Sequence, residues 1–359
     1  MKILIVSGYF KPNITPRAFR TTELAVELAR QGNDVTIYLP WVDYDYSCFE
    51  MEFGVKILFF GKSDVEKRLF SSSKIAGKFY RLMNILFQYP KIKYIPQIYK
   101  TLQNEKGYDL LISIGAPYSI HWGVDKLIRR NEFLAKKWIA DCGDPFMGSK
   151  VEIFPNPFWF KFLEKSFCKR ANYITVPIEK AINSYYPEFR SKIKVIPQGF
   201  NFSKNEYNKV KENPVPTFAY AGMFYKGNRD PRPFLDLLLT IDLDFLFVLY
   251  TPKWEALYPY IEKFKGKIEI RELVPRDELL SVLSQMDFLV NFENGTASQS
   301  PSKLIDYTIA SRPILSVSQK PDITILNSFL TGDYSNQFIF ENIDNYNIKN
   351  VSKQFIRLK

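Results

Sequence analysis

The chain has 359 residues, of which 46% are hydrophobic and 24% are charged. This composition is typical of a folded protein with sizeable cores and excludes an intrinsically disordered chain. No stretch approaches the roughly 20 continuous apolar residues that span a bilayer, and the amino-terminal residues lack a signal-peptide cleavage pattern. With one histidine and three cysteines, none at metal or redox spacing, we expect a cytoplasmic protein without a bound metal.

The net charge of +11 comes entirely from the first part of the chain. Residues 1–200 contain 30 basic and 19 acidic side chains, whereas residues 201–359 contain 19 of each. Residues 62–106 alone carry ten basic and three acidic side chains, with Phe and Tyr interleaved. Three interpretations stay open: a solvated lysine face over aromatic packing, a helix on an anionic lipid surface, and a nucleic-acid site.

Strand and helix patterns alternate along the first 200 residues. Apolar runs predict strands, and helical periodicity predicts helices between them. Alternation at this spacing predicts a doubly wound parallel sheet. The first loop, SGYFKPNITPR, lacks GxGxxG, which disfavours an ordinary dinucleotide site. The predicted strands are 2–9, 34–40, 55–60, 109–117, 137–146, 172–178 and 194–200, and the predicted helices are 17–32, 119–130 and about 157–170.

A second α/β pattern follows a polar, proline-bounded segment at residues 201–216, which we interpret as a linker. The sequence thus predicts domains at 1–200 and 217–336 and a tail at 337–359, and one hypothesis returns this tail to the first domain. Ligands of open parallel sheets bind at the carboxyl ends of strands, so each domain would hold one ligand. The predicted strands are 217–224, 245–252, 267–274, 287–292 and 313–317, and the predicted helices lie near 231–240, 253–264 and 276–286 and from 301 onward.

The stretch SQSPSKLIDYTIASRPIL at 298–315 predicts a helix that begins with an anion site. Ser300 is a natural N-cap, and Pro301 suits the first helical position. Exposed helix amides together with Lys303 would favour a phosphate group. Asp306 lies one turn beyond Ser302, where it could accept hydrogen bonds from the diol of a ribose. The alternative is an ordinary capped helix.

A second basic loop, AYAGMFYKGNRDPRPF at 219–234, follows the first strand of the second domain. Gly222 would let the backbone approach a ligand closely. Lys226, Arg229 and Arg232 offer charge for a diphosphate, and Arg matches phosphate in a bidentate way. The alternative is a solvated loop.

In the first domain, Gly8 lies in the first loop, and His121 lies in the first turn of a predicted helix. Asp141 and Asp144 follow a strand end, which is a suitable place for a carboxylate that meets a hydroxyl. A lone His is more often structural than functional.

Four stretches together resemble the GT-B-fold glycosyltransferases, in particular the family-4-like group that uses nucleotide-sugar donors. Residues 301–315 resemble the donor-site stretch "PSKLFEYMAAGKPIL", and residues 220–231 resemble the Gly-containing diphosphate loop. Residues 115–121 and 138–146 resemble the "PPxSxH…vaDfRDpW" pattern. Residues 194–200, KVIPQGF, match the "vIpNGf" strand before the linker.

The resemblance implies two Rossmann-like doubly wound domains facing a central cleft. It implies transfer of a hexose from a UDP- or GDP-sugar to an acceptor hydroxyl, with retention and without a metal or other cofactor, in cell-surface polysaccharide or glycolipid synthesis. Arg229 and Lys303 would hold the diphosphate, and Asp306 would take the place of the ribose-binding Glu. His121 and Asp144 would face the sugar and the acceptor. The rest of the implied donor site comprises Gly8, Gly222, Lys226, Ser300, Ser302 and Leu304.

The sequence departs from the family pattern at several positions. Gly143 and Phe146 stand where "RDpW" has Arg and Trp, Ser311 replaces a Gly, and Ser298 stands where the longer motif has a Glu. These departures leave the identity of the donor open. A sugar-nucleotide epimerase of the same fold, a binding module without catalysis and an inactive sugar-nucleotide binder stay as alternatives.

For partners, we expect a nucleotide-sugar donor and a glycan or lipid-linked acceptor. We also expect residues 62–106 to bring the protein to an anionic inner-leaflet surface, as a peripheral protein that does not bind nucleic acid.

Overall fold

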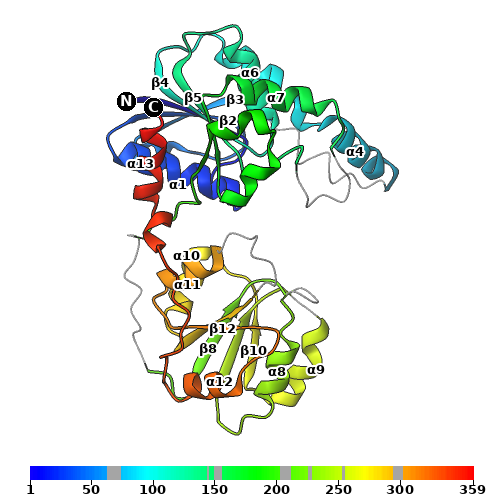
Figure 1. The fold of residues 1–359 in the computed structure, drawn as a ribbon, viewed down its shortest axis with the longest axis vertical. Helices are drawn as coiled ribbons and strands as arrows, with labels where there is room; N and C mark the ends of the chain where they lie inside the picture. The colour runs from blue at the N-terminus through cyan, green and yellow to red at the C-terminus, as the bar shows by residue number, and fades with distance from the viewer. Residues whose placement is uncertain are drawn as a thin grey trace. The chain divides into compact units, whose positions relative to one another are not determined.

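The chain forms two compact units, each built around its own parallel sheet (Figure 1). The first comprises Met1–Asn201 together with Asp344–Lys359, and the second comprises Phe202–Ile343. This computed structural model describes residues 1–62, 74–143, 145–148, 156–202, 212–224, 229–252, 255–293 and 302–359, without the side chains of 74–76 and 302.

The first unit contains a seven-stranded sheet in the order β3-β2-β1-β4-β5-β6-β7, with all pairs parallel. Strand β1, inside the sheet, pairs Ile3 with Val35 of β2 and with Leu110 of β4. Its apolar run is buried because helices cover both faces of a parallel sheet. The strands are β1 (Lys2–Ser7), β2 (Asp34–Trp41), β3 (Val55–Lys62), β4 (Tyr108–Ile114), β5 (Ala135–Asp141), β6 (Tyr173–Val176) and β7 (Ile193–Val195).

Two groups of helices cover this sheet. The apolar faces of α1, α2 and α13 pack on one side, and those of α5, α6 and α7 pack on the other. Helix α13 lies beside α1 (Figure 1), where Gln31 Nε2 donates to Ser352 Oγ over 2.7 Å. The last helix therefore completes the first unit, and both chain ends lie there. The helices are α1 (Pro16–Arg30), α2 (Ser47–Phe53), α4 (Lys74–Phe87), α5 (Tyr94–Leu102), α6 (Ser119–Ile128), α7 (Phe160–Arg170) and α13 (Ile348–Arg357).

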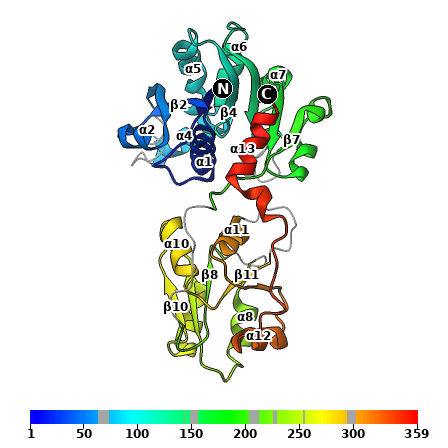
Figure 2. The same cartoon turned by 90° about the vertical axis from the view of Figure 1, so that its left-hand side faces the viewer.

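The second unit contains a five-stranded parallel sheet in the order β10-β9-β8-β11-β12. Helices α8, α9 and α12 pack on one face, and α10 and α11 pack on the other (Figures 1 and 2). The chain reverses its direction of travel across the sheet between β8 and β11, and such a switch point opens a crevice at the carboxyl ends of the strands. The elements are β8 (Thr217–Ala221), α8 (Arg232–Leu238), β9 (Leu246–Tyr250), α9 (Tyr258–Phe264), β10 (Ile268–Arg271), α10 (Arg276–Leu283), β11 (Phe288–Phe292), α11 (Ser302–Ile309), β12 (Ile314–Val317) and α12 (Ile323–Leu330).

The alternation of strands and helices predicted from the sequence is confirmed, with shifts at element ends. The helix predicted at 253–264 is divided: a 3₁₀ turn at Glu255–Leu257 precedes α9, and Lys265 follows with a positive φ of 48°. The strand predicted at 267–274 ends at Arg271, because the next residues turn toward Pro275 and the start of α10. Within the described residues, no helix combines the length and apolarity needed to cross a membrane.

Candidate functional site

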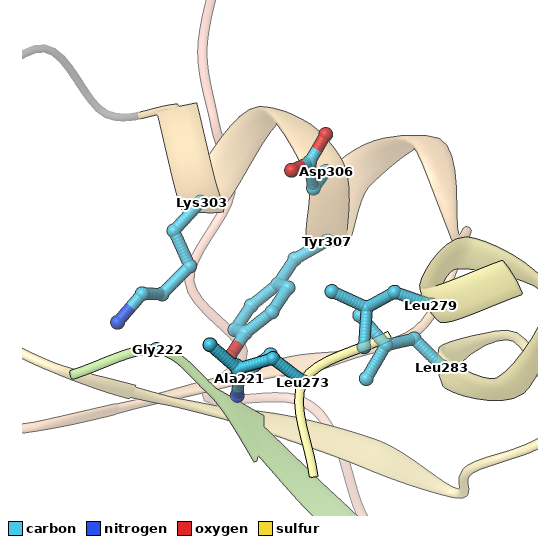
Figure 3. A pocket seen from close by; sticks show the side chains of 8 residues that line it. All are labelled: Ala221, Gly222, Leu273, Leu279, Leu283, Lys303, Asp306 and Tyr307. Carbon is cyan, nitrogen blue, oxygen red and sulfur yellow. The ribbon is translucent and has the colours of Figure 1, made fainter. Parts of the chain in front are cut away.

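A hollow of about 190 Å³ lies in the second unit, where the carboxyl end of β8 meets α10 and α11. Figure 3 shows that Lys303 and Asp306 come from the same helix and that the Lys303 side chain extends toward Gly222. This is the edge at which parallel sheets bind ligands. The lining residues are Ala221, Gly222, Leu273, Leu279, Leu283, Lys303, Asp306 and Tyr307.

Gly222 brings bare backbone to the floor of this hollow. Its φ is +144°, a conformation that glycine adopts and other residues rarely do. A Cβ at this position would lie 2.6 Å from Nζ of Lys303, so a side chain would displace the ammonium. The Gly222 N–H donates to the carbonyl oxygen of Tyr250 over 2.9 Å, which fixes the turn.

Lys303 is held over an aromatic ring and close to another cation. Its Nζ donates to the Tyr220 hydroxyl over 2.9 Å and lies 4.0 Å from the centre of that ring. Burial, assisted by the charge of Arg229, lowers the pKa of Lys303 to about 7. The ammonium therefore has little local compensation for its charge, and an anion that reached it would favour the protonated form.

Asp306 is the acidic side chain of the hollow, and an arginine holds it. Arg276 of α10 donates to Oδ1 of Asp306 from Nε over 2.9 Å and from the terminal guanidinium nitrogen over 2.6 Å. Burial raises the pKa of Asp306, while the charge and hydrogen bonds of Arg276 act against this rise. Because both bonds end on Oδ1, Oδ2 is the oxygen better placed to accept further hydrogen bonds.

An apolar wall completes the hollow. Leu273, Leu279 and Leu283 supply it from the β10–α10 connection and from α10 (Figure 3). The Tyr307 hydroxyl accepts the N–H of Ala221 over 2.9 Å, which fixes α11 against β8. The hollow thus combines an apolar wall, a carboxylate and a lysine, a set suited to a ligand with a flat ring at one end and an anion at the other.

The structure brings three of the predicted donor-site residues together, namely Gly222, Lys303 and Asp306. Arg229 lies close enough for its charge to lower the pKa of Lys303. Leu304 differs, because it packs against the core beneath α11 and is not among the lining residues. Lys226, Ser300 and Pro301 lie outside the described residues, and Ser302 opens α11 without a described side chain.

His121 lies in the core of the first unit, in contrast to the expected position against a substrate. The imidazole is fully buried, with Nδ1 2.8 Å from Ser113 Oγ and Nε2 3.5 Å from Cys142 Sγ. Burial lowers its pKa to about 3, so the ring is neutral. The physical reason is packing: the ring stacks on Phe167, and Gly115 leaves room for its Nε2.

Asp141 is also buried, and side chains of the unit occupy its carboxylate. Arg20 donates to both oxygens over 2.6 and 2.7 Å, and the Thr175 hydroxyl donates over 2.6 Å. Burial acts to raise the pKa of Asp141, but the charge of Arg20 outweighs it and the pKa lies below its usual value. Asp144 lies outside the described residues. Gly8, at the end of β1, packs so closely on Pro117 that a Cβ would overlap the proline ring.

Sequence reasoning missed Arg276, Tyr220 and the three leucines. Arg276 follows Pro275 at the start of α10, and only the fold brings it to Asp306, 30 residues later in the chain. Tyr220 belongs to the apolar strand β8, and no local pattern predicts its hydrogen bond with Lys303, 83 residues later in the chain. Among the described residues, no group of three or more His, Cys, Asp or Glu side chains is arranged to hold a metal ion.

Comparison with known proteins relates the chain to others by structure alone. No protein-family model matches it, and no curated protein sequence matches it either. Solved structures match along the whole chain. The lipopolysaccharide outer core galactosyltransferase WaaB is 10% identical with a TM-score of 0.60, covering 100% of this chain and 99% of its own.

Two further solved structures agree with this match. Anabaena Alr3699/HepE in complex with UDP-glucose is 10% identical with a TM-score of 0.58, covering 99% of this chain and 98% of its own. A glycosyltransferase from Rickettsia africae is 10% identical with a TM-score of 0.60, covering 99% and 97%. At this identity the likeness concerns the fold, which is GT-B with two Rossmann-like parallel-sheet units, as predicted.

Proposed function

We propose that this protein is a glycosyltransferase that moves a sugar from a nucleotide diphosphate sugar to an acceptor hydroxyl. One observation carries the proposal: Lys303 with its lowered pKa, the bare backbone of Gly222 and the carboxylate of Asp306 share one hollow. A nucleotide diphosphate has phosphates, a ribose diol and a flat base, and each has a chemical counterpart there. Structures of the same fold contain UDP and UDP-glucose, which supports this ligand class.

In this proposal the diphosphate lies against Lys303 and Arg229. The ribose hydroxyls donate to Asp306, whose orientation Arg276 fixes. The base lies against the leucines of the β10–α10 region, where burial of apolar surface contributes about 25 cal/mol per Å². Lys226, Ser300 and Ser302 remain predicted contacts of the phosphates.

The chemistry asked of these side chains is stabilisation of a leaving diphosphate. As the bond between sugar C1 and the phosphate oxygen breaks, negative charge develops on the diphosphate. Lys303 and Arg229 are already in place to stabilise that charge, and each preorganised donor of this kind is worth on the order of 10²–10³ in rate. Because two side chains supply this charge, we expect transfer to continue in EDTA. We also propose retention at C1, as the family resemblance implies.

A thermal-shift panel of UDP-, GDP- and dTDP-sugars tests the donor site. A ligand at about 100 times its dissociation constant stabilises the folded protein by about 2.7 kcal/mol. Lys303→Ala should abolish the shift, and Lys263→Ala, a change at an exposed lysine of α9, should leave it intact. Absence of a shift with every sugar nucleotide would refute the proposal. Conversion of the donor sugar without an acceptor, followed by NMR, would instead indicate an epimerase.

We further propose that the acceptor is presented at an anionic membrane surface, in polysaccharide or glycolipid synthesis. Helix α4 supports this, because Phe79, Leu82 and Phe87 are 59%, 51% and 47% exposed. The ring of Phe87 stacks on Trp159, whose Nε1 donates to the carbonyl oxygen of Leu86 over 3.0 Å. The exposed rings of the segment before and within α7 therefore continue the apolar surface of α4.

Basic side chains accompany these exposed rings. Lys78 and Arg81 lie on α4, Lys91 and Lys93 follow it, and Lys161 lies on α7. Exposed apolar side chains with bases beside them suit the interface of an anionic bilayer better than plain solvent. We expect binding to vesicles that contain anionic lipid at low salt, and release as salt rises.

Vesicle flotation tests this surface with a matched pair of variants. Phe79→Ser should weaken binding, whereas Phe133→Ser, at another ring that is 81% exposed on the same unit, should not. Equal binding by both variants, or no binding at low salt, would contradict the membrane proposal and leave the donor site unaffected.

A further inference from the structure

Arg17 is a cation at the carboxyl edge of the first sheet that the proposed function has not used. It is the second residue of α1, and its side chain is 20% exposed. Its guanidinium lies beside Asp141 at the end of β5, with 3.5 Å between the nearest charged atoms. Its charge also lowers the pKa values of His121 and Cys142. The guanidinium lies against Gly143, two residues after the end of β5.

The charge of Arg17 is in excess at this place. Asp141 is the acidic group that faces it, and Arg20 already pairs with both carboxylate oxygens. The Thr175 hydroxyl takes a further lone pair of that carboxylate. Because His121 is neutral, the group of Arg17, Arg20 and Asp141 carries a net charge of +1. Among the described residues, Glu164 is another carboxyl group whose charge reaches Cys142, and burial raises its pKa to about 7, which reduces its charge near neutral pH.

The guanidinium of Arg17 also lacks hydrogen bonds within the described structure. Arg20 donates to Asp141 and to the carbonyl oxygens of Ile196 and Pro197, whereas Arg17 has only the 3.5 Å ion pair. An Arg side chain offers five N–H donors in a fixed planar arrangement. A largely buried group of this kind that makes no hydrogen bond is poorly satisfied, and a bidentate anion would satisfy it.

Gly143 makes room for this guanidinium. A Cβ at residue 143 would overlap the Arg17 side chain, so any other residue there would displace it. The family pattern that the sequence resembles has an Arg at this position, in "RDpW". In this chain the arginine beside the end of β5 therefore comes from α1, as Arg17, and not from the loop that follows β5.

We propose that Arg17 binds a phosphate group of a substrate at the carboxyl edge of the first sheet. In this proposal Gly143, which lacks a side chain, leaves the space that the Arg17 guanidinium occupies. The inference rests on the proposed function for the class of ligand. Two sources can supply the phosphate: the diphosphate of the nucleotide sugar, or the diphosphate of a lipid-linked acceptor. Both offer the paired oxygens that a guanidinium fork matches.

The test is a set of four proteins: wild type, Arg17→Met, Gly143→Arg, and the double variant with both changes. Met keeps the apolar stem and removes the charge. Titration calorimetry measures UDP for the donor source and farnesyl diphosphate, added to UDP-saturated protein, for the lipid source. We expect Arg17→Met to weaken one of the two about 10- to 100-fold, as loss of a charged hydrogen-bond donor does.

The double variant distinguishes a binding role from a structural one. Gly143→Arg alone should place two guanidinium groups in one space and lower the melting temperature. Combined with Arg17→Met, it returns a single cation to the same place, and we expect it to restore most of the lost affinity. A weakened UDP affinity assigns the donor source, and a weakened farnesyl diphosphate affinity assigns the lipid source.

Other results would overturn the proposal. Unchanged affinity for both ligands in folded Arg17→Met would do so, as would a folded double variant without restored affinity. If Arg17→Met does not fold, the same affinities are measured for Arg17→Lys, which keeps the positive charge but lacks the planar pair of N–H donors. Lys303→Ala, run in parallel, separates the two proposals. If Lys303→Ala does not bind UDP but Arg17→Met binds both ligands with unchanged affinity, only this inference fails. If Lys303→Ala binds UDP with normal affinity, the proposed function fails.

Discussion

The lowered pKa of Lys303 predicts that the affinity of the protein for a nucleotide diphosphate falls as the pH rises above 7. Burial and the charge of Arg229 bring this pKa to about 7 from an ordinary 10.5. A diphosphate bound to the ammonium would return the pKa toward its ordinary value, so binding must take up a proton above pH 7. The free protein holds Lys303 half protonated at pH 7 and almost fully neutral at pH 9.

The magnitude follows from these two pKa values. The pKa of Lys303 is about 7 in the free protein, and its ordinary value is 10.5. Full return to the ordinary value on binding would weaken UDP binding about 50-fold between pH 7 and pH 9. The phosphates of UDP do not change charge appreciably in this range, because a second phosphate pKa lies near 6. Titration calorimetry in buffers of different ionisation enthalpy should report uptake of about half a proton at pH 7 and nearly one at pH 9.

Lys303→Arg is the matched control, because Arg stays charged throughout this range. Its UDP affinity should vary much less than that of the wild type between pH 7 and pH 9. A wild-type affinity that stays constant across the same range, with no proton uptake, would refute the reasoning. It would mean either that Lys303 is charged in the free protein or that it does not meet the diphosphate.

Three further predictions concern single side chains. Arg276→Ala leaves the partly buried carboxylate of Asp306 without its partner, and we expect a loss of about 2–3 kcal/mol of unfolding free energy in urea. Gly222→Ala places a methyl group 2.6 Å from Nζ of Lys303 at a φ of +144°, so UDP affinity should fall at least tenfold by calorimetry. Burial raises the pKa of Glu164 to about 7. Protonation of this group therefore favours the folded state, and the free energy of unfolding should fall by about 2–3 kcal/mol as pH rises from 4.5 to 7.

Each of these predictions has a control. Arg276→Ala combined with Asp306→Ala should cost less than Arg276→Ala alone, because the second change removes the unpaired charge. A double variant that loses more stability than the single one would argue against the ion pair as the cause. Gly266→Ala, at another positive-φ glycine with no neighbour within 4 Å, should leave UDP binding unchanged. Glu164→Gln should remove the pH dependence of the free energy of unfolding between pH 4.5 and pH 7. If that dependence persists in the variant, another group causes it.

The residues singled out by sequence in the second unit lie together in one hollow, whereas His121 and Asp141 of the first unit are buried among other side chains. In the second unit, Gly222, Lys303 and Asp306 each lie in a short stretch that has a local physical signature: a turn glycine, a helix start and one turn of helix. Such signatures survive because neighbours along the chain remain neighbours in space. Arg276 has no such signature, and it reaches Asp306 only because α10 and α11 pack side by side on one face of the sheet.

The first unit shows where local signatures mislead. A His in the first turn of a helix after a strand suggested a contact with substrate, yet packing against Phe167 and Ser113 places the ring in the core. Asp141 suggested a carboxylate open to a ligand, yet Arg20 occupies it from α1. Burial and partners of a polar side chain depend on elements far away in sequence.

The sequence by itself determined the two α/β units, the order of their elements and the residues of α11 that line the hollow, because hydrophobic periodicity and helix-start chemistry act over a few neighbouring residues. The tertiary structure alone decided which polar side chains are charged and which can reach a ligand. The tertiary structure lowers the pKa of Lys303 through burial, pairs Arg276 with Asp306 and brings the Arg17 guanidinium against Gly143. Desolvation and ion pairing act through space, so they become fixed only when the sheets bring distant segments together.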